Sequence, residues 1–232
     1  MWQFDGRLAR WQGTAPEFSI DVQKPELGLQ QVRPDRSLPP LANAMLLRVE
    51  LVRPGTATLT ASDSYVRGDD LIASYSTSDS PFGWQIYWRR AETDSGLEVV
   101  LSLQNRLLSG NPAIRVTSCL PSNETWYFDS SGQPLDAQAV TSGQVRPTIF
   151  AIALDNQWAY AEWVHPADVQ DVQVHRSATT VTTAWTVFGD DLEKGVIRRA
   201  RLRGEFFLRE SLTTELPTRL HSFLHSPIPL ST

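Results

Sequence analysis

The sequence of 232 residues contains a single cysteine, Cys119, so no disulfide bond can form within the chain. Unpaired cysteines are typical of proteins in reducing compartments. The first residues do not combine a basic segment with an apolar stretch, so we expect no secretory signal and a cytoplasmic location. The longest apolar run, residues 149–154, is six residues long and far short of the ~20 that cross a bilayer. We therefore expect no association with a membrane.

Several motifs that mark well-known chemistries are also missing. The sequence has no Gly-x-x-x-x-Gly-Lys, Gly-x-Gly-x-x-Gly, His-Glu-x-x-His or Gly-x-Ser-x-Gly, which excludes the common nucleotide loops, the zincin helix and the esterase elbow. One cysteine and four histidines cannot build a cysteine-rich zinc site. The acidic turns at residues 69–70 and 190–193 lack EF-hand spacing. We expect no metal ion and no cofactor.

Positive charge is in the minority. The chain has 21 lysines and arginines against 26 aspartates and glutamates, which gives a formal net charge of −5. Nucleic-acid binding usually requires clustered positive charge. We therefore expect no nucleic-acid partner.

The dominant pattern in the sequence is an alternation of apolar and polar residues. In residues 17–22, Phe18, Ile20 and Val22 alternate with polar side chains, and residues 97–104 and 114–120 follow the same rule. Strands with one buried and one solvated face are typical of antiparallel sheets. Because one open sheet would not hold so many strands, the pattern predicts an all-β fold, a large antiparallel two-sheet β-sandwich. We expect residues 1–232 to form a single sandwich domain, with a barrel as the structural alternative.

Other local signals refine this prediction. Residues 216–225 predict a short C-terminal helix with Pro217 in its first turn. The Pro- and Gln-rich residues 23–43 predict irregular chain. Turn-forming clusters lie at residues 53–55, 67–70 and 189–191, and the last of them predicts a hairpin over residues 179–208.

A first candidate site is the polar and aromatic stripe of residues 83–90. Gln85, Tyr87 and Arg89 share one strand face, opposite Trp84, Ile86 and Trp88. An aromatic ring beside polar side chains can stack on a sugar ring and hydrogen-bond its hydroxyls. An ordinary solvated sheet face gives the same pattern, so Tyr87 and Arg89 are candidates for ligand binding.

A second candidate site is the densest group of titratable residues beside aromatics. Glu162, His165 and Asp168 lie within seven residues of each other, next to Trp163. Glu162 and His165 can serve as base and acid if burial adjusts their pKa values, whereas a hydrogen bond that stabilises a turn is the structural alternative. Glu162 and His165 are the candidate catalytic residues, and Trp163 and Asp168 the candidate binding residues.

A third candidate is an arginine stripe near the C-terminus. Arg199, Arg201 and Arg203 alternate with Ala200 and Leu202. Arginine forks match carboxylates and phosphates, so the stripe predicts either an anionic ligand such as a uronic acid, a subunit contact, or a sheet face held by ion pairs. In the last case, acidic partners would come from a neighbouring strand.

Two segments support a resemblance. Residues 189–197 with the arginine-rich strand after them, and residues 65–71, resemble segments of uncharacterised bacterial all-β proteins. The layout of many strands is similar to the galactose-mutarotase-like supersandwich group. That resemblance implies sugar binding, and for the mutarotases a histidine acid and a glutamate base, for which Glu162 and His165 are the only pair to consider.

Three functional hypotheses follow. The first is a saccharide-binding protein, favoured by eight tryptophans and the mixed aromatic and polar faces. The second is a sugar-modifying enzyme of the epimerase or lyase type. The third is a structural protein or a homo-oligomer in which a second chain covers exposed aromatic residues.

Overall fold

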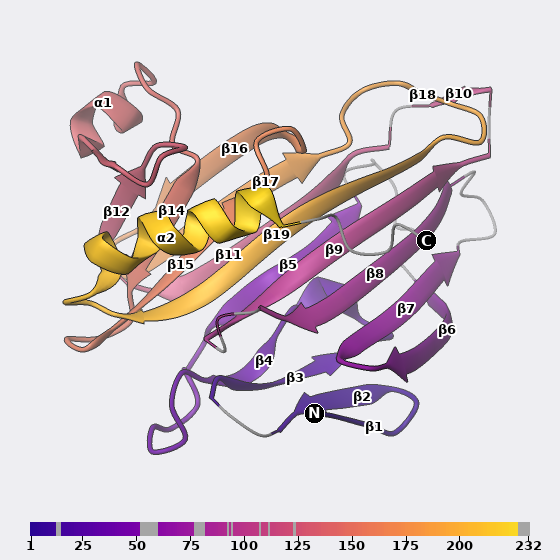
Figure 1. Cartoon of the computed structure of the whole chain (residues 1–232), viewed down its shortest axis with the longest axis horizontal. Coiled ribbons are helices and arrows are strands. Elements are labelled where there is room, and N and C mark those ends of the chain that lie inside the picture. Colours follow the sequence, from indigo (N-terminus) through magenta and orange to yellow (C-terminus); the bar gives the residue numbers. More distant parts are fainter. Residues whose placement is uncertain are drawn as a thin grey trace.

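The largest element of the fold is an antiparallel sheet of nine strands (Figure 1). It belongs to a computed structural model that describes residues 1–12, 15–51, 60–76, 82–91, 93, 95–106, 108–110, 112–122 and 124–226, so that the turn predicted at residues 53–55 lies outside the described residues. From one edge to the other, the strands are β13 (Pro134–Leu135), β12 (Thr125–Phe128), β14 (Ile149–Ala153), β15 (Trp158–Val164), β19 (Ile197–Leu208), β9 (Gly96–Asn105), β8 (Phe82–Arg90), β7 (Asp70–Ser76) and β6 (Thr60–Arg67).

A second layer covers one face of this sheet and consists of two four-stranded sheets. One contains β1 (Trp2–Phe4), β2 (Leu8–Trp11), β3 (Glu17–Asp21) and β4 (Gln30–Arg33); the other has the order β16 (Val169–Arg176), β17 (Thr180–Val187), β11 (Ile114–Pro121), β5 (Met45–Leu51). An isolated bridge between Leu29 and Leu46 links the two. Two short strands, β10 (Ser109–Gly110) and β18 (Leu192–Glu193), pair with each other, and a 3₁₀ turn, η1, spans Pro25–Leu27.

A continuous apolar core fills the space between the layers. It receives Trp11 and Ile20 from the N-terminal sheet, Trp185 from the second sheet, and Trp88 and Leu101 from the large sheet, all of them buried. Burial of each such side chain contributes about 1.5–3 kcal/mol. The predicted all-β antiparallel sandwich is therefore confirmed, while its organisation as one domain stays a prediction that this shared core supports.

Helix α2 (Leu212–His225) covers the opposite face of the large sheet (Figure 1). Its buried side chains, Leu212, Leu216, Leu220 and Phe223, recur every three or four residues, as one face of a helix requires. The predicted C-terminal helix is confirmed, although it begins before Leu216 and places Pro217 inside it. A second helix, α1 (Ala137–Thr141), is capped at its N-terminus by Asp136, whose carboxylate accepts a hydrogen bond from the Ala139 amide at 3.0 Å.

Two local predictions are wrong. Strands β17 and β19 lie in different layers, so residues 179–208 do not form a hairpin; β19 pairs with β15 and β9 instead. Residues 23–43 are not wholly irregular, because β4 adds a fourth strand to the N-terminal sheet. The first error concerns pairing between distant segments, which local composition does not encode, whereas β4 pairs with β3, the preceding strand in the sequence. Among the described residues, no helix is long and apolar enough to cross a membrane.

Gly204 allows a test of how side chains pack on the core face of the large sheet. A Cβ atom at Gly204 would collide with the phenol of Tyr160, because that ring lies against the glycine of the neighbouring strand. We expect Gly204→Ala to destabilise the fold by about 1–3 kcal/mol, measured by chemical denaturation. Gly83→Ala in β8 is the matched control, since its Cβ would meet only the flexible end of Arg106. Equal stability of the two variants would contradict this account.

Candidate functional site

Glu162 lies in the core between the two layers and is 1% exposed. Its carboxylate accepts hydrogen bonds from Ser118 at 2.7 Å, from Trp185 Nε1 at 2.9 Å and from Tyr160 at 3.3 Å, and also from Thr183. Burial raises the pKa of Glu162, and these donors oppose that effect. Three of the four donors, Ser118, Thr183 and Trp185, belong to the second layer, so Glu162 connects the two layers, and its burial keeps it out of reach of a substrate.

His165 and Asp168 lie on the other side of the large sheet. The Asp168 amide donates to the His165 carbonyl at 2.8 Å, and the Asp168 carboxylate accepts from the Arg201 amide at 3.1 Å. Burial raises the pKa of Asp168, with the Arg201 amide and His165 acting in the opposite direction. Residues three apart in a strand point to opposite faces, so the fold does not bring Glu162 and His165 together as an acid and base pair.

Helix α2 covers three of the residues that the sequence suggested for ligand binding. Trp163, Arg201 and Arg203 are 0%, 3% and 2% exposed. Both guanidinium groups lie 4.8 Å from the ring centroid of Phe223, which α2 inserts between them and the solvent. The ligand-binding role predicted for these three side chains stays a prediction, and in this structure α2 covers all three.

A ladder of alternating charges crosses the same face of the sheet. Arg67, Asp70, Arg89, Glu98 and Arg203 are cross-strand neighbours in this order on β6, β7, β8, β9 and β19. The Asp70 carboxylate accepts two hydrogen bonds from Arg89, of 3.0 and 3.3 Å, and the Glu98 carboxylate accepts one from Arg203 at 2.9 Å. Within the arginine stripe, Arg203 thus takes an acidic partner from the neighbouring strand β9, one of the alternatives that the sequence left open.

Beyond α2, no described helix or strand covers the outer face of β6 to β9, and we call this surface the open face, although Ile72 and Val100 on it are buried by their neighbouring side chains. Tyr87 packs with Ile72 and Val100 and donates from its hydroxyl to Gln85 Oε1 at 2.7 Å. Burial raises the pKa of Tyr87, and the nearby Tyr65 raises it further, while Arg199 lowers it. The phenol of Tyr87 therefore stays protonated at neutral pH. Tyr65 is the one exposed aromatic side chain of the described ranges, at 41%.

A row of polar side chains runs beside Tyr87. Ser74, Gln85, Ser102 and Arg199 are successive cross-strand neighbours on β7, β8, β9 and β19. Gln85 Nε2 donates to Ser74 Oγ at 3.1 Å. The Nε of Arg199 is buried and has no hydrogen-bond partner among the described residues, and no ion pair holds its guanidinium there. A hollow of about 230 Å³ is lined by the three neutral residues of the row, Ser74, Gln85 and Ser102, together with Gln104 and Arg106.

The sequence pattern identified Gln85, Tyr87, Arg89 and Arg199 on this face, but missed Ser74, Ser102 and Gln104. Ser102 and Gln104 belong to the solvated set of residues 97–104, so the alternation already placed them on one face. Their proximity to Tyr87 depends on the pairing of β8 with β9. Six of the eight tryptophans are core residues, so their number does not indicate a binding surface.

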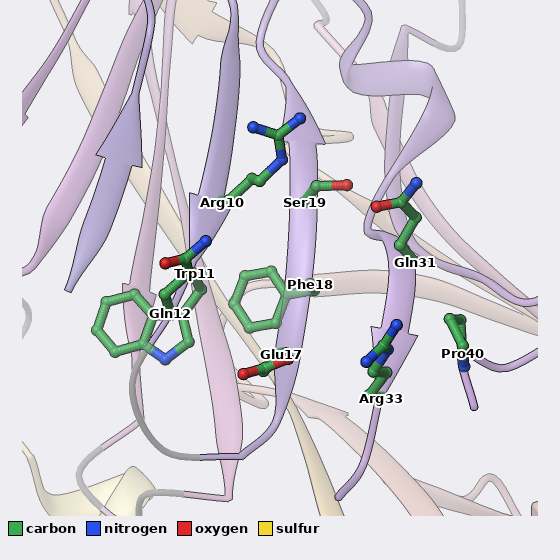
Figure 2. Close-up of a pocket in the computed structure, with 9 residues that line it drawn as sticks. All are labelled: Arg10, Trp11, Gln12, Glu17, Phe18, Ser19, Gln31, Arg33 and Pro40. Carbon is green, nitrogen blue, oxygen red and sulfur yellow. The ribbon is translucent and has the colours of Figure 1, made fainter. Parts of the chain in front are cut away.

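Two other hollows lie elsewhere in the described structure. The first, of about 280 Å³, lies on the N-terminal sheet between Arg10, Ser19, Gln31 and Arg33 (Figure 2). Its two aromatic residues, Trp11 and Phe18, point into the core and offer no exposed ring. The second, of about 500 Å³, opens between the layers beside α1. In the part of the chain that the structure describes, no group of three His, Cys, Asp or Glu side chains could hold a metal ion.

No protein-family model and no curated protein matches the sequence. The structure is similar to a candidate aldose 1-epimerase from Escherichia coli K12, with a TM-score of 0.58 and 9% identity over 86% of this chain and 98% of that one. It is also similar to a candidate aldose 1-epimerase from Klebsiella pneumoniae, with a TM-score of 0.57 and 8% identity over 97% and 87%.

A galactose mutarotase related enzyme from Lactobacillus acidophilus gives a TM-score of 0.54 and 8% identity, over 85% of this chain and 96% of that one. At these identities the likeness concerns the fold alone. It confirms that the chain has a galactose-mutarotase-like β-sandwich fold, as the resemblance of its layout implied.

Proposed function

We propose that the chain binds a saccharide on the open face of the nine-stranded sheet. The observation that carries this proposal is the register-aligned row of Ser74, Gln85, Ser102 and Arg199. Adjacent strands lie about 4.8 Å apart, so the row extends over about 14 Å, a length that suits a short oligosaccharide. Hydroxyl and amide side chains can exchange hydrogen bonds with sugar hydroxyls in both directions.

The aromatic and charged neighbours of the row add to this proposal. The exposed ring of Tyr65 shares its cross-strand row with Tyr87 through Ile72, and it offers an apolar surface on which a sugar ring can pack. Arg199 supplies a cation without an acidic partner among the described residues. These features favour a ligand that carries at least one carboxylate, such as an oligosaccharide with a uronic acid.

Binding is favoured over modification of the sugar. The strands that surround the open face, β6 to β9 and β19, contain no histidine. Both carboxylates of the charge ladder are held by arginines, which leaves exposed Asp63, opposite Ser74, as the one carboxylate of the described β6 to β9 without an arginine partner. Acid and base catalysis on a sugar uses two groups with free proton sites. The structures named as epimerases support the saccharide class through their fold.

The proposal is tested with Arg199→Ala and a panel of neutral and acidic oligosaccharides. A thermal-shift screen and titration calorimetry should show stabilisation of the wild type by an acidic oligosaccharide. Loss of a charge-assisted hydrogen bond of about 1.5–3 kcal/mol should weaken that affinity by about 10- to 100-fold, at about 1.4 kcal/mol per factor of ten.

The matched control is Arg198→Ala, one residue earlier on the same strand. Its side chain points to the other face, where it pairs with Asp190 at 3.2 Å, so the affinity should not change. If no saccharide stabilises the wild type, or if both variants bind equally well, saccharide binding on the open face is wrong.

A further inference from the structure

The hollow of about 500 Å³ lies on the opposite side of the large sheet from the open face. Tyr127 of β12 and Phe150 of β14 form its floor, and Val172 and Val174 of β16 form the facing wall. Residues 140–147, from α1 and the segment after it, line the remaining side. Its volume falls within the range of about 300–1,000 Å³ that is typical of small-molecule sites.

The inner surface of this interlayer pocket is mostly apolar. The rings of Tyr127 and Phe150 meet edge to face with centroids 5.8 Å apart, and both side chains are almost fully buried. Val140, Val172 and Val174 are only partly buried against the core, so they supply the apolar surface that a ligand can reach. A sugar would leave most of its hydroxyls without partners here. The body of a ligand for this pocket must therefore be apolar.

The charged residues around the pocket favour an anion. Arg146 lines it beside a carboxylate, Asp171, which already accepts a hydrogen bond from Gln173 Nε2 at 3.0 Å. Arg146 is exposed and forms no ion pair with any residue that the structure describes. An arginine beside an apolar cavity is well suited to hold a carboxylate or sulfonate while the rest of the ligand is buried.

We infer that this interlayer pocket binds an amphipathic organic anion, in which an aromatic or aliphatic body packs on Val140, Val172 and Val174 and the acidic group pairs with Arg146. The site is separate from the open face because Tyr127 and Phe150 point to the core side of the large sheet. It therefore does not depend on saccharide binding.

The test uses two naphthalene dyes that differ in charge, 1-anilinonaphthalene-8-sulfonate and the neutral N-phenyl-1-naphthylamine. On the folded protein, fluorescence titration and calorimetry should show one saturable site for each dye. Arg146→Ala should weaken the sulfonate at least threefold and leave the neutral dye unchanged. Arg10→Ala, an exposed arginine of the N-terminal sheet, is the control and should alter neither dye.

Two variants test the location of the site. Val174→Trp and Val140→Trp place an indole into the pocket from different walls, and each should weaken both dyes at least tenfold. If one variant does not fold, the other still decides the question. Binding without saturation, sulfonate affinity that is the same in Arg146→Ala, or unchanged binding of both dyes in the folded tryptophan variants would overturn the inference.

Discussion

Replacement of Glu162 by alanine is expected to lower the free energy of unfolding by about 3 kcal/mol or more. The change leaves Trp185 Nε1 and the hydroxyls of Ser118, Thr183 and Tyr160 without their acceptor in the core. Each buried donor without a partner costs about 1–3 kcal/mol, although the hydroxyls can turn toward other acceptors. Denaturation in urea measures the difference, and exposed Glu193→Ala is the control.

The same carboxylate predicts a dependence of stability on pH. Because burial raises the pKa of Glu162 in the folded chain above its ordinary value of 4.5, the unfolded chain ionises first as the pH increases. The contribution of Glu162 is therefore fully present below pH 4.5 and is lost as the pH rises through the folded pKa. Glu162→Gln lacks this ionisation, so the stability of the wild type relative to Glu162→Gln should fall over that interval.

Two results would contradict this account of Glu162. One is an alanine variant as stable as Glu193→Ala, which would mean that the four donors find other partners at no cost. The other is a difference between the wild type and Glu162→Gln that is constant or increases with pH.

Much of the fold was predictable because the alternation within each strand is a local property. The faces of residues 17–22, 97–104 and 114–120 and the helix at the C-terminus all follow from spacing alone. The assignment of strands to layers was not predictable in the same way. The sequence around Gly189 resembles a hairpin turn, yet the chain changes layer there, and only the packing of β19 between β15 and β9 decides this.

The candidate site was predictable to the same extent. The stripe of Gln85, Tyr87 and Arg89 and the stripe from Arg199 to Arg203 lie on one face of one sheet, although they are more than a hundred residues apart. The sequence could not show that α2 covers one end of the second stripe. Local periodicity gives the orientation of a side chain, whereas its burial depends on which distant element packs above it.

Helix α2 covers Arg203 but not Arg199 of the same strand, so we expect the two arginines to differ in their contribution to stability. Arg203→Ala leaves Glu98 buried and unpaired and removes one of the cations that contact Glu205 and the Phe223 ring. Breaking a buried ion pair by removing one partner costs about 3–5 kcal/mol. For a chain of this size, each kcal/mol corresponds to roughly 2–4 °C in Tm. We therefore expect Arg203→Ala to lower Tm by about 6–20 °C.

Arg199→Ala is the matched comparison, because Arg199 lies on the same face of β19 and is half-buried without an ion pair in the described ranges. We expect it to change the free energy of unfolding by less than about 1 kcal/mol, while it reduces the affinity for an acidic oligosaccharide. Calorimetric unfolding gives the Tm of each variant, and ligand titration gives the affinity of each for the acidic oligosaccharide. If Arg203→Ala is as stable as Arg199→Ala, then α2 is not held by the buried charges beneath it, and the covered arginines remain candidates for ligand binding.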